Sequence, residues 1–185
     1  MIDAVILAGG KSSRMGRDKA LLPFKGYSSL AKYQYERLKP LFNEVYISAK
    51  ENKFDFSPPL IYDNSNISSP LIALHTILNT LKHPIFLIAV DMPLLPPSEI
   101  QKLLKEYKKN PSFEAYIFKS PNGLEPLAAI YTPKVIKNVE NMLANNNHKM
   151  KSFLSNINFT LVKSDYQNYF TNLNYIKEYQ KLNNT

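Results

Sequence analysis

The stretch from Ile2 to Ala8 is a nearly unbroken apolar run that ends at two glycines, Gly9 and Gly10. Runs of this length and composition are typical of strands that are buried on both faces of a parallel sheet. The run from Ile85 to Val90 has the same character and leads directly into Asp91. We therefore expect a sheet with helices packed against both of its faces, which narrows the fold to the α/β class.

The segments around these two runs alternate between helical and extended patterns. Apolar residues at helical spacing predict helices, and short β-rich runs predict strands. The predicted helices are 30–41, 70–81, 98–108, 133–143, a short one near 152 and one from about 174, and the other predicted strands are 44–49, 60–62, 114–119, 126–131 and 159–163. This order predicts a doubly wound α/β domain with a mostly parallel sheet, in which ligands bind beyond the carboxyl ends of the strands.

The length and composition limit the classes of protein to consider. A chain of 185 residues suits one compact core, so we expect a single domain over 1–185. No apolar run reaches membrane-spanning length, and no basic region precedes the apolar N-terminal run as in a secretion signal. We therefore expect a cytoplasmic protein without membrane contact.

The residue types also limit the chemistry. The chain has no cysteine, which excludes disulfides, thiolate metal sites and cysteine nucleophiles. A metal would need oxygen or histidine ligands, and Mg²⁺ fits that restriction. The net charge of +8 suits polyanionic partners, but the basic residues are scattered along the chain. Without a basic helix or an aromatic-basic module, we expect no nucleic-acid partner.

The segment from Leu7 to Lys19 has the composition of a phosphate-binding loop. It carries three glycines and four cationic side chains immediately after a buried strand. Glycines let the backbone approach a ligand closely, and lysine and arginine neutralise phosphate oxygens. The P-loop spacing is not met, because five residues separate Gly10 from Gly16, and the dinucleotide pattern of glycines is also absent.

Asp91 is the second candidate, because it stands at the carboxyl end of the predicted strand 85–90. A carboxylate there can bind a hard cation that bridges nucleotide phosphates. The alternative is a turn aspartate, for which the nearby Pro93 is a natural companion. Both interpretations remain open on these residues alone.

The pattern Leu-Ala-Gly-Gly-x-Ser-x-Arg-Met-Gly-x-Asp-Lys at 7–19 resembles the N-terminal signature of the molybdenum cofactor guanylyltransferases. The resemblance implies a Rossmann-like nucleotidyltransferase fold, with a nucleotide-binding half at about 1–95 and an acceptor-binding half at about 96–185. It implies that Asp91 binds Mg²⁺ and that Arg14 and Lys19 stabilise phosphate charge. The residues implied to bind the nucleotide are Leu7, Ala8, Gly9, Gly10, Lys19, Asp63 and Asp91. Glycine at position 9, where cytidylyl and sugar-phosphate enzymes tend to have alanine, favours guanine.

The rest of the chain is similar to the family with some departures. Asp63 resembles the aspartate before the family's Gly-Pro-Leu-Ala-Gly segment, which here reads Ser-Pro-Leu-Ile-Ala at 69–73. Ser48 stands where the family often has an asparagine near the guanine, so that role is not transferred. Glu125 in the segment 124–128 resembles the substrate-side strand. Asn172 and Asn174 match the family's C-terminal Phe-x-Asn-x-Asn, which implies contacts with the acceptor.

The implied activity is transfer of GMP from GTP to the phosphate of molybdopterin or molybdenum-molybdopterin. Mg²⁺ is the implied cofactor, transient contacts with other molybdenum cofactor proteins are possible, and we expect a monomer. One alternative is the same chemistry with another nucleotide or acceptor, as in a molybdopterin cytidylyltransferase or a sugar-phosphate nucleotidylyltransferase. Another is a catalytically silent nucleotide-binding regulator, which the departures at Ser48 and at 69–73 favour.

Overall fold

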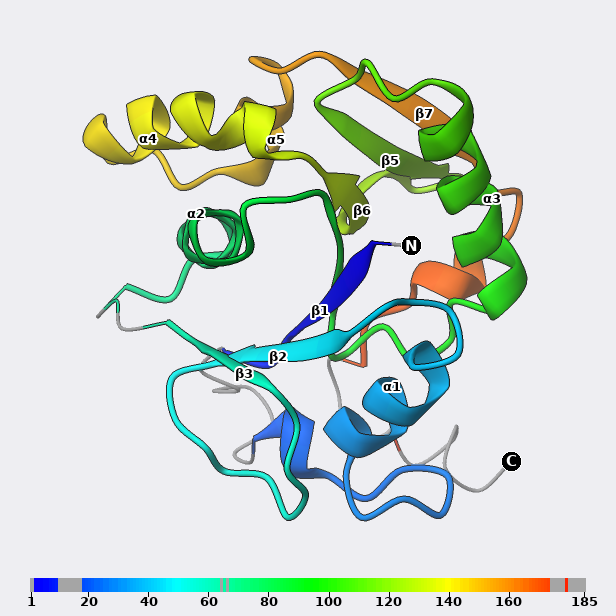
Figure 1. Cartoon of the computed structure of the whole chain (residues 1–185). Helices are drawn as coiled ribbons and strands as arrows, with labels where there is room; N and C mark the ends of the chain where they lie inside the picture. The colour runs from blue at the N-terminus through cyan, green and yellow to red at the C-terminus, as the bar shows by residue number, and fades with distance from the viewer. Residues whose placement is uncertain (1, 10–17, 64, 66, 174–178, 180–185) are drawn as a thin grey trace.

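The computed structural model describes residues 2–9, 18–63, 65, 67–173 and 179. These residues form a seven-stranded sheet with the strand order β3-β2-β1-β4-β6-β5-β7, and helices cover both of its faces (Figure 1). The predicted α/β class with a doubly wound, mostly parallel sheet is therefore confirmed. Among the described residues, no helix combines the length and the apolar character needed to cross a membrane.

The elements follow the predicted order along the chain. The strands are β1 (Asp3–Leu7), β2 (Val45–Ala49), β3 (Leu60–Tyr62), β4 (Ile85–Ala89), β5 (Ala115–Ser120), β6 (Gly123–Tyr131) and β7 (Phe159–Lys163). The α-helices are α1 (Leu30–Leu38), α2 (Pro70–Leu81), α3 (Pro97–Lys109), α4 (Ile136–Ala144) and α5 (Met150–Leu154). Short 3₁₀ helices are η1 (Lys19–Leu21), η2 (Pro133–Val135) and η3 (Gln167–Phe170).

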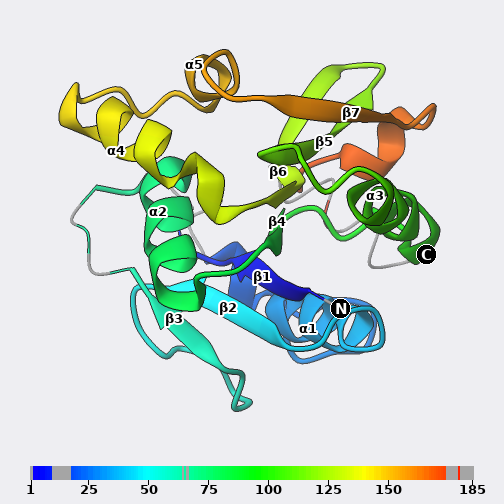
Figure 2. The same cartoon turned by 45° about the horizontal axis from the view of Figure 1, so that its top comes forward.

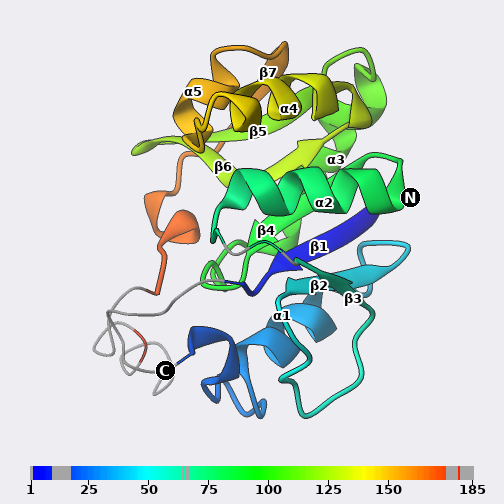
Figure 3. The same ribbon diagram turned by 90° about the vertical axis from the view of Figure 1, so that its left-hand side faces the viewer.

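The helices pack on the two faces of the sheet as separate layers (Figures 2 and 3). Side chains alternate between the faces along β1, because successive residues of a strand point to opposite sides. Ala4 and Ile6 belong to the core cluster that includes residues of α1 and α3. Val5 belongs to the cluster that includes residues of α2, α4 and α5. The central strands are thus buried on both faces, as their apolar runs predict.

The strand β6 departs from the parallel arrangement. It is antiparallel to both of its neighbours, β4 and β5. The reason is the connection from Ser120 to Gly123, which is too short for a crossover and permits only a hairpin. Gly123 adopts a φ of 126°, a conformation that favours glycine. The strand was predicted to begin at Pro126, and it begins earlier because the hairpin pairs residues close to the turn.

Proline and serine residues set the end of α1 and the start of α2. The helix predicted over 30–41 ends at Leu38, and Lys39 caps it with helical backbone angles, because Pro40 has no N–H to donate and cannot continue the helical hydrogen bonds. The predicted start of α2 is confirmed, since the Ser69 hydroxyl accepts a hydrogen bond from the Leu71 N–H at 3.2 Å and Pro70 follows it. The helix predicted from about Asn174 lies outside the described residues, apart from the single residue Tyr179.

The sheet brings the carboxyl ends of four strands to one edge. In the register, Leu7 at the end of β1 pairs with Ser48 of β2 on one side and with Ala89 of β4 on the other. The chain runs outward from β1 through β2 to β3, and α2 then carries it back to β4 on the opposite side of β1. Such a reversal of strand order is where ligands bind in open α/β sheets.

Candidate functional site

Two adjoining pockets lie beyond these strand ends, and both are lined by Leu7, Gly9 and Pro70. We call them the Asp91 pocket and the Asp63 pocket. The Asp91 pocket, of about 190 Å³, lies between the ends of β1 and β4. Its other lining residues are Ala8, Asp18, Lys19, Ala20, Ala89, Val90, Asp91 and Leu127.

The central feature of the Asp91 pocket is an ion pair between two predicted site residues. Lys19 Nζ lies 3.0 Å from Asp91 Oδ2, although the residues are 72 positions apart. Their side chains are 15% and 20% exposed, so both remain accessible to a ligand. A cation and a carboxylate at the end of a central strand can manage the charge of a triphosphate and its metal ion.

Asp18 and Lys53, which the sequence analysis did not assign to the site, fix the backbone around Lys19. Asp18 begins η1, where its Oδ1 accepts a hydrogen bond from the Ala20 N–H at 3.0 Å. Its other carboxylate oxygen pairs with Lys53 Nζ, which also donates to the Ala8 carbonyl at 3.0 Å. Lys53 therefore ties the end of β1 to the start of η1. The position of Lys53 in the loop after β2 gives little indication of this role, because lysines in loops are usually exposed to solvent.

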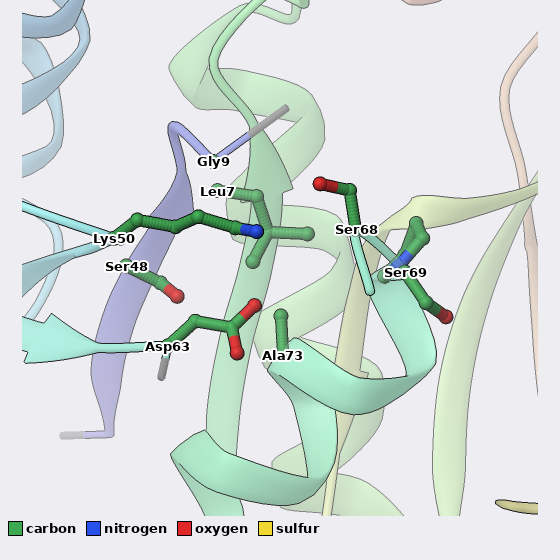
Figure 4. Close-up of a pocket in the computed structure, with 9 residues that line it drawn as sticks. Leu7, Gly9, Ser48, Lys50, Asp63, Ser68, Ser69 and Ala73 are labelled. Carbon is green, nitrogen blue, oxygen red and sulfur yellow. The ribbon is translucent and has the colours of Figure 1, made fainter. Parts of the chain in front are cut away.

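The Asp63 pocket, of about 360 Å³, lies between the ends of β1, β2 and β3 and the start of α2. Figure 4 shows the Asp63 carboxylate and the Lys50 ammonium directed into the same space, beside Ser48. Asp63 is 8% exposed, and its Oδ1 accepts a hydrogen bond from the Ser65 N–H at 3.0 Å. Lys50 is exposed and was not predicted. The pocket thus presents both donors and acceptors to a ligand.

Two small residues shape the approach to this pocket. Among the described residues, a Cβ atom added at Gly9 would meet only the Ser48 carbonyl at 4.0 Å, which is an ordinary contact. The described part of the fold therefore does not require glycine at position 9, where the residue lines both pockets. Ala73 stands where the resembling family has a glycine, and it lines the pocket on the α2 side.

The predicted residues divide into three groups by their placement. The pockets bring together Leu7, Ala8, Gly9, Lys19, Asp63 and Asp91. Gly10, Arg14 and Asn174 lie outside the described residues. Asn172 is adjacent to Leu173, whose N–H donates to the Asp91 carbonyl at 2.9 Å. This contact brings the C-terminal segment to the turn that carries Asp91.

Glu125 lies near the beginning of β6, where its Oε1 accepts a hydrogen bond from the Ser120 hydroxyl at 2.6 Å. Partial burial raises the pKa of Glu125, and the hydrogen bond from Ser120 partly opposes that effect. Leu127, two residues further along the strand, lines the Asp91 pocket. Glu125 is thus close to this pocket in the chain, but it is not among the residues that line it.

The residues available for a metal ion fit one that binds together with a nucleotide. Within the part of the chain that the structure describes, no group of three or more His, Cys, Asp or Glu residues is placed to hold a metal. Mg²⁺ commonly keeps several waters and binds one or two carboxylates together with substrate phosphates. Asp91 provides such a carboxylate at the wall of its pocket.

Comparison with known proteins gives a consistent result along nearly the whole chain. A molybdenum cofactor guanylyltransferase from Campylobacter jejuni is 36% identical over 183 residues, covering 97% of this chain and 94% of the relative. One from Helicobacter pylori is also 36% identical, covering 97% of this chain and 90% of that protein.

The fold has a close counterpart in a solved structure. The molybdopterin-guanine dinucleotide biosynthesis protein A from Archaeoglobus fulgidus superposes with a TM-score of 0.83, covering 99% of this chain and 97% of that chain. At 19% identity this likeness concerns the fold alone. Residues 4–161 match the family model described as the MobA-like NTP transferase domain. The chain therefore belongs to the MobA-like NTP transferase family.

Proposed function

We propose that this protein is a molybdenum cofactor guanylyltransferase, which transfers GMP from GTP to the terminal phosphate of molybdopterin or molybdenum-molybdopterin. The observation that carries the proposal is the Lys19–Asp91 pair at 3.0 Å, at the point where the strand order of a nucleotidyltransferase fold reverses. The names of relatives at 36% identity support the same activity.

The two adjoining pockets suggest how GTP is oriented. The base and ribose occupy the larger Asp63 pocket, and the phosphates extend past Gly9 into the Asp91 pocket. Guanine presents the acceptors O6 and N7 on one edge, which lysine can bind together, and carries a 2-amino donor on another edge. Lys50 and Asp63 provide the matching donor and acceptor. Cytosine presents a 4-amino donor instead, which does not suit Lys50.

The reaction needs alignment and charge neutralisation more than proton transfer. A phosphate oxygen of molybdopterin attacks the α-phosphorus of GTP and forms a new P–O bond. The bond from the α-phosphorus to the oxygen that bridges to the β-phosphate breaks, and pyrophosphate leaves with the bonding electrons. Because the attacking phosphate is already anionic near neutral pH, no general base is required.

The charged residues have separate roles in this scheme. Lys19, with Arg14 from the same N-terminal segment, neutralises charge on the transferred and leaving phosphates. Asp91 would hold Mg²⁺, which would offset the negative charge of the phosphates when bound. Lys19 Nζ lies beside Oδ2 of the same carboxylate, so Asp91 would serve both the lysine and the metal ion.

The acceptor occupies the side of the Asp91 pocket formed by the second half of the chain. Glu125, Asn172 and Asn174 are the proposed acceptor contacts, and the hydrogen bond from Leu173 to the Asp91 carbonyl supports the C-terminal assignment. The division near residue 95, the cytoplasmic location, the monomeric state and the contacts with other molybdenum cofactor proteins stay predictions.

Two measurements test this function in sequence. Thermal unfolding with Mg²⁺ and one nucleotide at a time should give the largest stabilisation with GTP, because a ligand that binds only the folded state raises its apparent stability. Pyrophosphate release should then require molybdopterin, GTP and Mg²⁺ together. A preference for CTP would indicate a cytidylyltransferase, and nucleotide binding without pyrophosphate release would indicate a silent regulator.

A further inference from the structure

Two polar side chains of α1, Gln34 and Arg37, face the turn after β4 rather than solvent. Gln34 is fully buried, and its Nε2 donates to the carbonyls of Ala89 and Val90 at 3.4 and 3.2 Å. Arg37 Nε donates to Gln34 Oε1, so the two side chains act as one unit. A buried amide needs such partners, because leaving it unpaired costs free energy.

Arg37 reaches the far side of the same turn. Its Nη1 donates to the Leu95 carbonyl, and its Nη2 lies 3.4 Å from the Met92 carbonyl. Burial lowers the pKa of Arg37 to about 10, so the guanidinium remains charged at neutral pH. A planar guanidinium fixes several acceptors in one geometry, which a lysine ammonium does not reproduce.

The carbonyls held in this way flank Asp91 on both sides. Gln34 holds the two residues before it, and Arg37 holds Met92 and Leu95 after it. The same helix is also linked to the segment that carries Lys19. The Leu30 N–H donates to the Leu22 carbonyl at 2.7 Å, and the Leu22 N–H donates to the Lys19 carbonyl at 3.2 Å. Helix α1 thus connects the backbones of both members of the ion pair.

We propose that Gln34 and Arg37 are positioning residues that set the place of the Asp91 carboxylate relative to Lys19 and the nucleotide phosphates. This inference rests on the proposed function. Neither residue lines either pocket, so both act through the backbone of the turn. A shift of the carboxylate by about 1 Å can reduce the rate about a hundredfold, because the reacting groups are aligned only over a short range.

The test compares Arg37→Lys and Gln34→Met with the wild type. The control is Lys39→Met, which removes an exposed cation at the end of α1. Among the described residues, the ion pair of Lys39 is with Glu36, at 3.7 Å. The steady-state constants for pyrophosphate release from GTP and molybdopterin give one readout. The affinity for Mn²⁺ in the presence of GTP, measured by electron paramagnetic resonance, gives a second that does not depend on turnover. Circular dichroism selects a temperature at which every variant is folded.

We expect Arg37→Lys to lower kcat about ten- to a hundredfold and to weaken Mn²⁺ binding, while the KM for GTP stays close to the wild-type value. Gln34→Met should act in the same direction, and Lys39→Met should match the wild type. Wild-type kcat and Mn²⁺ affinity in folded Arg37→Lys would overturn the positioning role while leaving the proposed function intact. A wild type that releases no pyrophosphate under any condition would overturn the proposed function, and this inference with it.

Discussion

The Asp91 pocket and the Asp63 pocket adjoin each other but are built differently. In the Asp91 pocket the charged groups that line it are paired, since Lys19 pairs with Asp91, and Asp18 pairs with Lys53 from outside the pocket. In the Asp63 pocket, Lys50 and Asp63 face the same space, and the hydrogen bond that involves the Asp63 carboxylate is a local one from Ser65.

This contrast indicates a division of tasks. Groups that are held in place before the ligand binds can stabilise charge without reorganisation, which is what catalysis requires. Groups that face open space offer hydrogen bonds that a base must match, which is what discrimination requires. We therefore expect changes in the Asp91 pocket to reduce turnover with any nucleotide, and changes in the Asp63 pocket to alter the preference between nucleotides.

The largest effect is expected for Asp91→Asn. The amide keeps the shape of the side chain but loses the charge that we propose holds the metal ion, so kcat should fall about a hundred- to a thousandfold. Asp55→Asn, at an exposed position, is the control. Steady-state pyrophosphate release measures both, and an Asp91→Asn variant with near wild-type turnover would show that the carboxylate is not the metal ligand.

A somewhat smaller loss is expected for Lys19→Met, about a hundredfold in kcat, because one cation that neutralises the phosphates is removed. The loss should be similar for every nucleotide that the enzyme accepts. Lys105→Met removes an exposed cation from α3 and should leave the rate unchanged. If Lys19→Met changed the ratio of GTP to CTP use instead, the division between the two pockets would be wrong.

Lys50→Met should change the preference between GTP and CTP more than the rate of the chemical step. Loss of the donor to guanine O6 and N7 should reduce the ratio of kcat/KM for GTP over CTP about tenfold or more, with a smaller effect on kcat. Lys50 is exposed, so stability should change little. Competition assays with both nucleotides measure the ratio, and an unchanged ratio would remove Lys50 from guanine recognition.

The smallest effect on the protein itself is expected for Gly9→Ala. Of the residues that the structure describes, the added methyl group meets only the Ser48 carbonyl, at 4.0 Å, so the free energy of unfolding should change by less than about 0.5 kcal/mol. GTP binding should weaken, because the methyl group enters the space shared by both pockets. Urea unfolding and thermal shift with GTP separate the two effects, and a destabilised protein would mean that the fold itself requires glycine here.

Much of the fold was predictable because the apolar runs of the central strands have few alternative arrangements. The runs at 2–8 and 85–90 are buried on both faces, as predicted, and Ser69–Pro70 begins α2. The antiparallel β6 was not predicted, because strand direction depends on the length of a connection whose ends were uncertain. The end of α1 at Leu38 was not predicted, because the helical spacing of Leu41 was given more weight than the presence of Pro40.

The site was predictable where charge follows directly on a strand, as at Asp63 and Asp91. The pairing of Lys19 with Asp91 required the three-dimensional structure, because 72 residues separate them. Gln34 and Arg37 occupy positions that look like the polar face of an amphipathic helix, and their hydrogen bonds to the turn after β4 explain why Gln34 is buried and Arg37 partly buried. Lys50 and Lys53 are two of many lysines in the chain, so the sequence alone did not distinguish them as site residues.

The most direct test of the account is the identity of the product when molybdopterin, Mg²⁺, GTP and CTP are supplied together at equal concentrations. We predict that mass spectrometry will detect molybdopterin guanine dinucleotide, formed in equal amount with pyrophosphate, and little of the cytosine dinucleotide. A cytosine dinucleotide as the main product, or no dinucleotide with either nucleotide, would contradict the account.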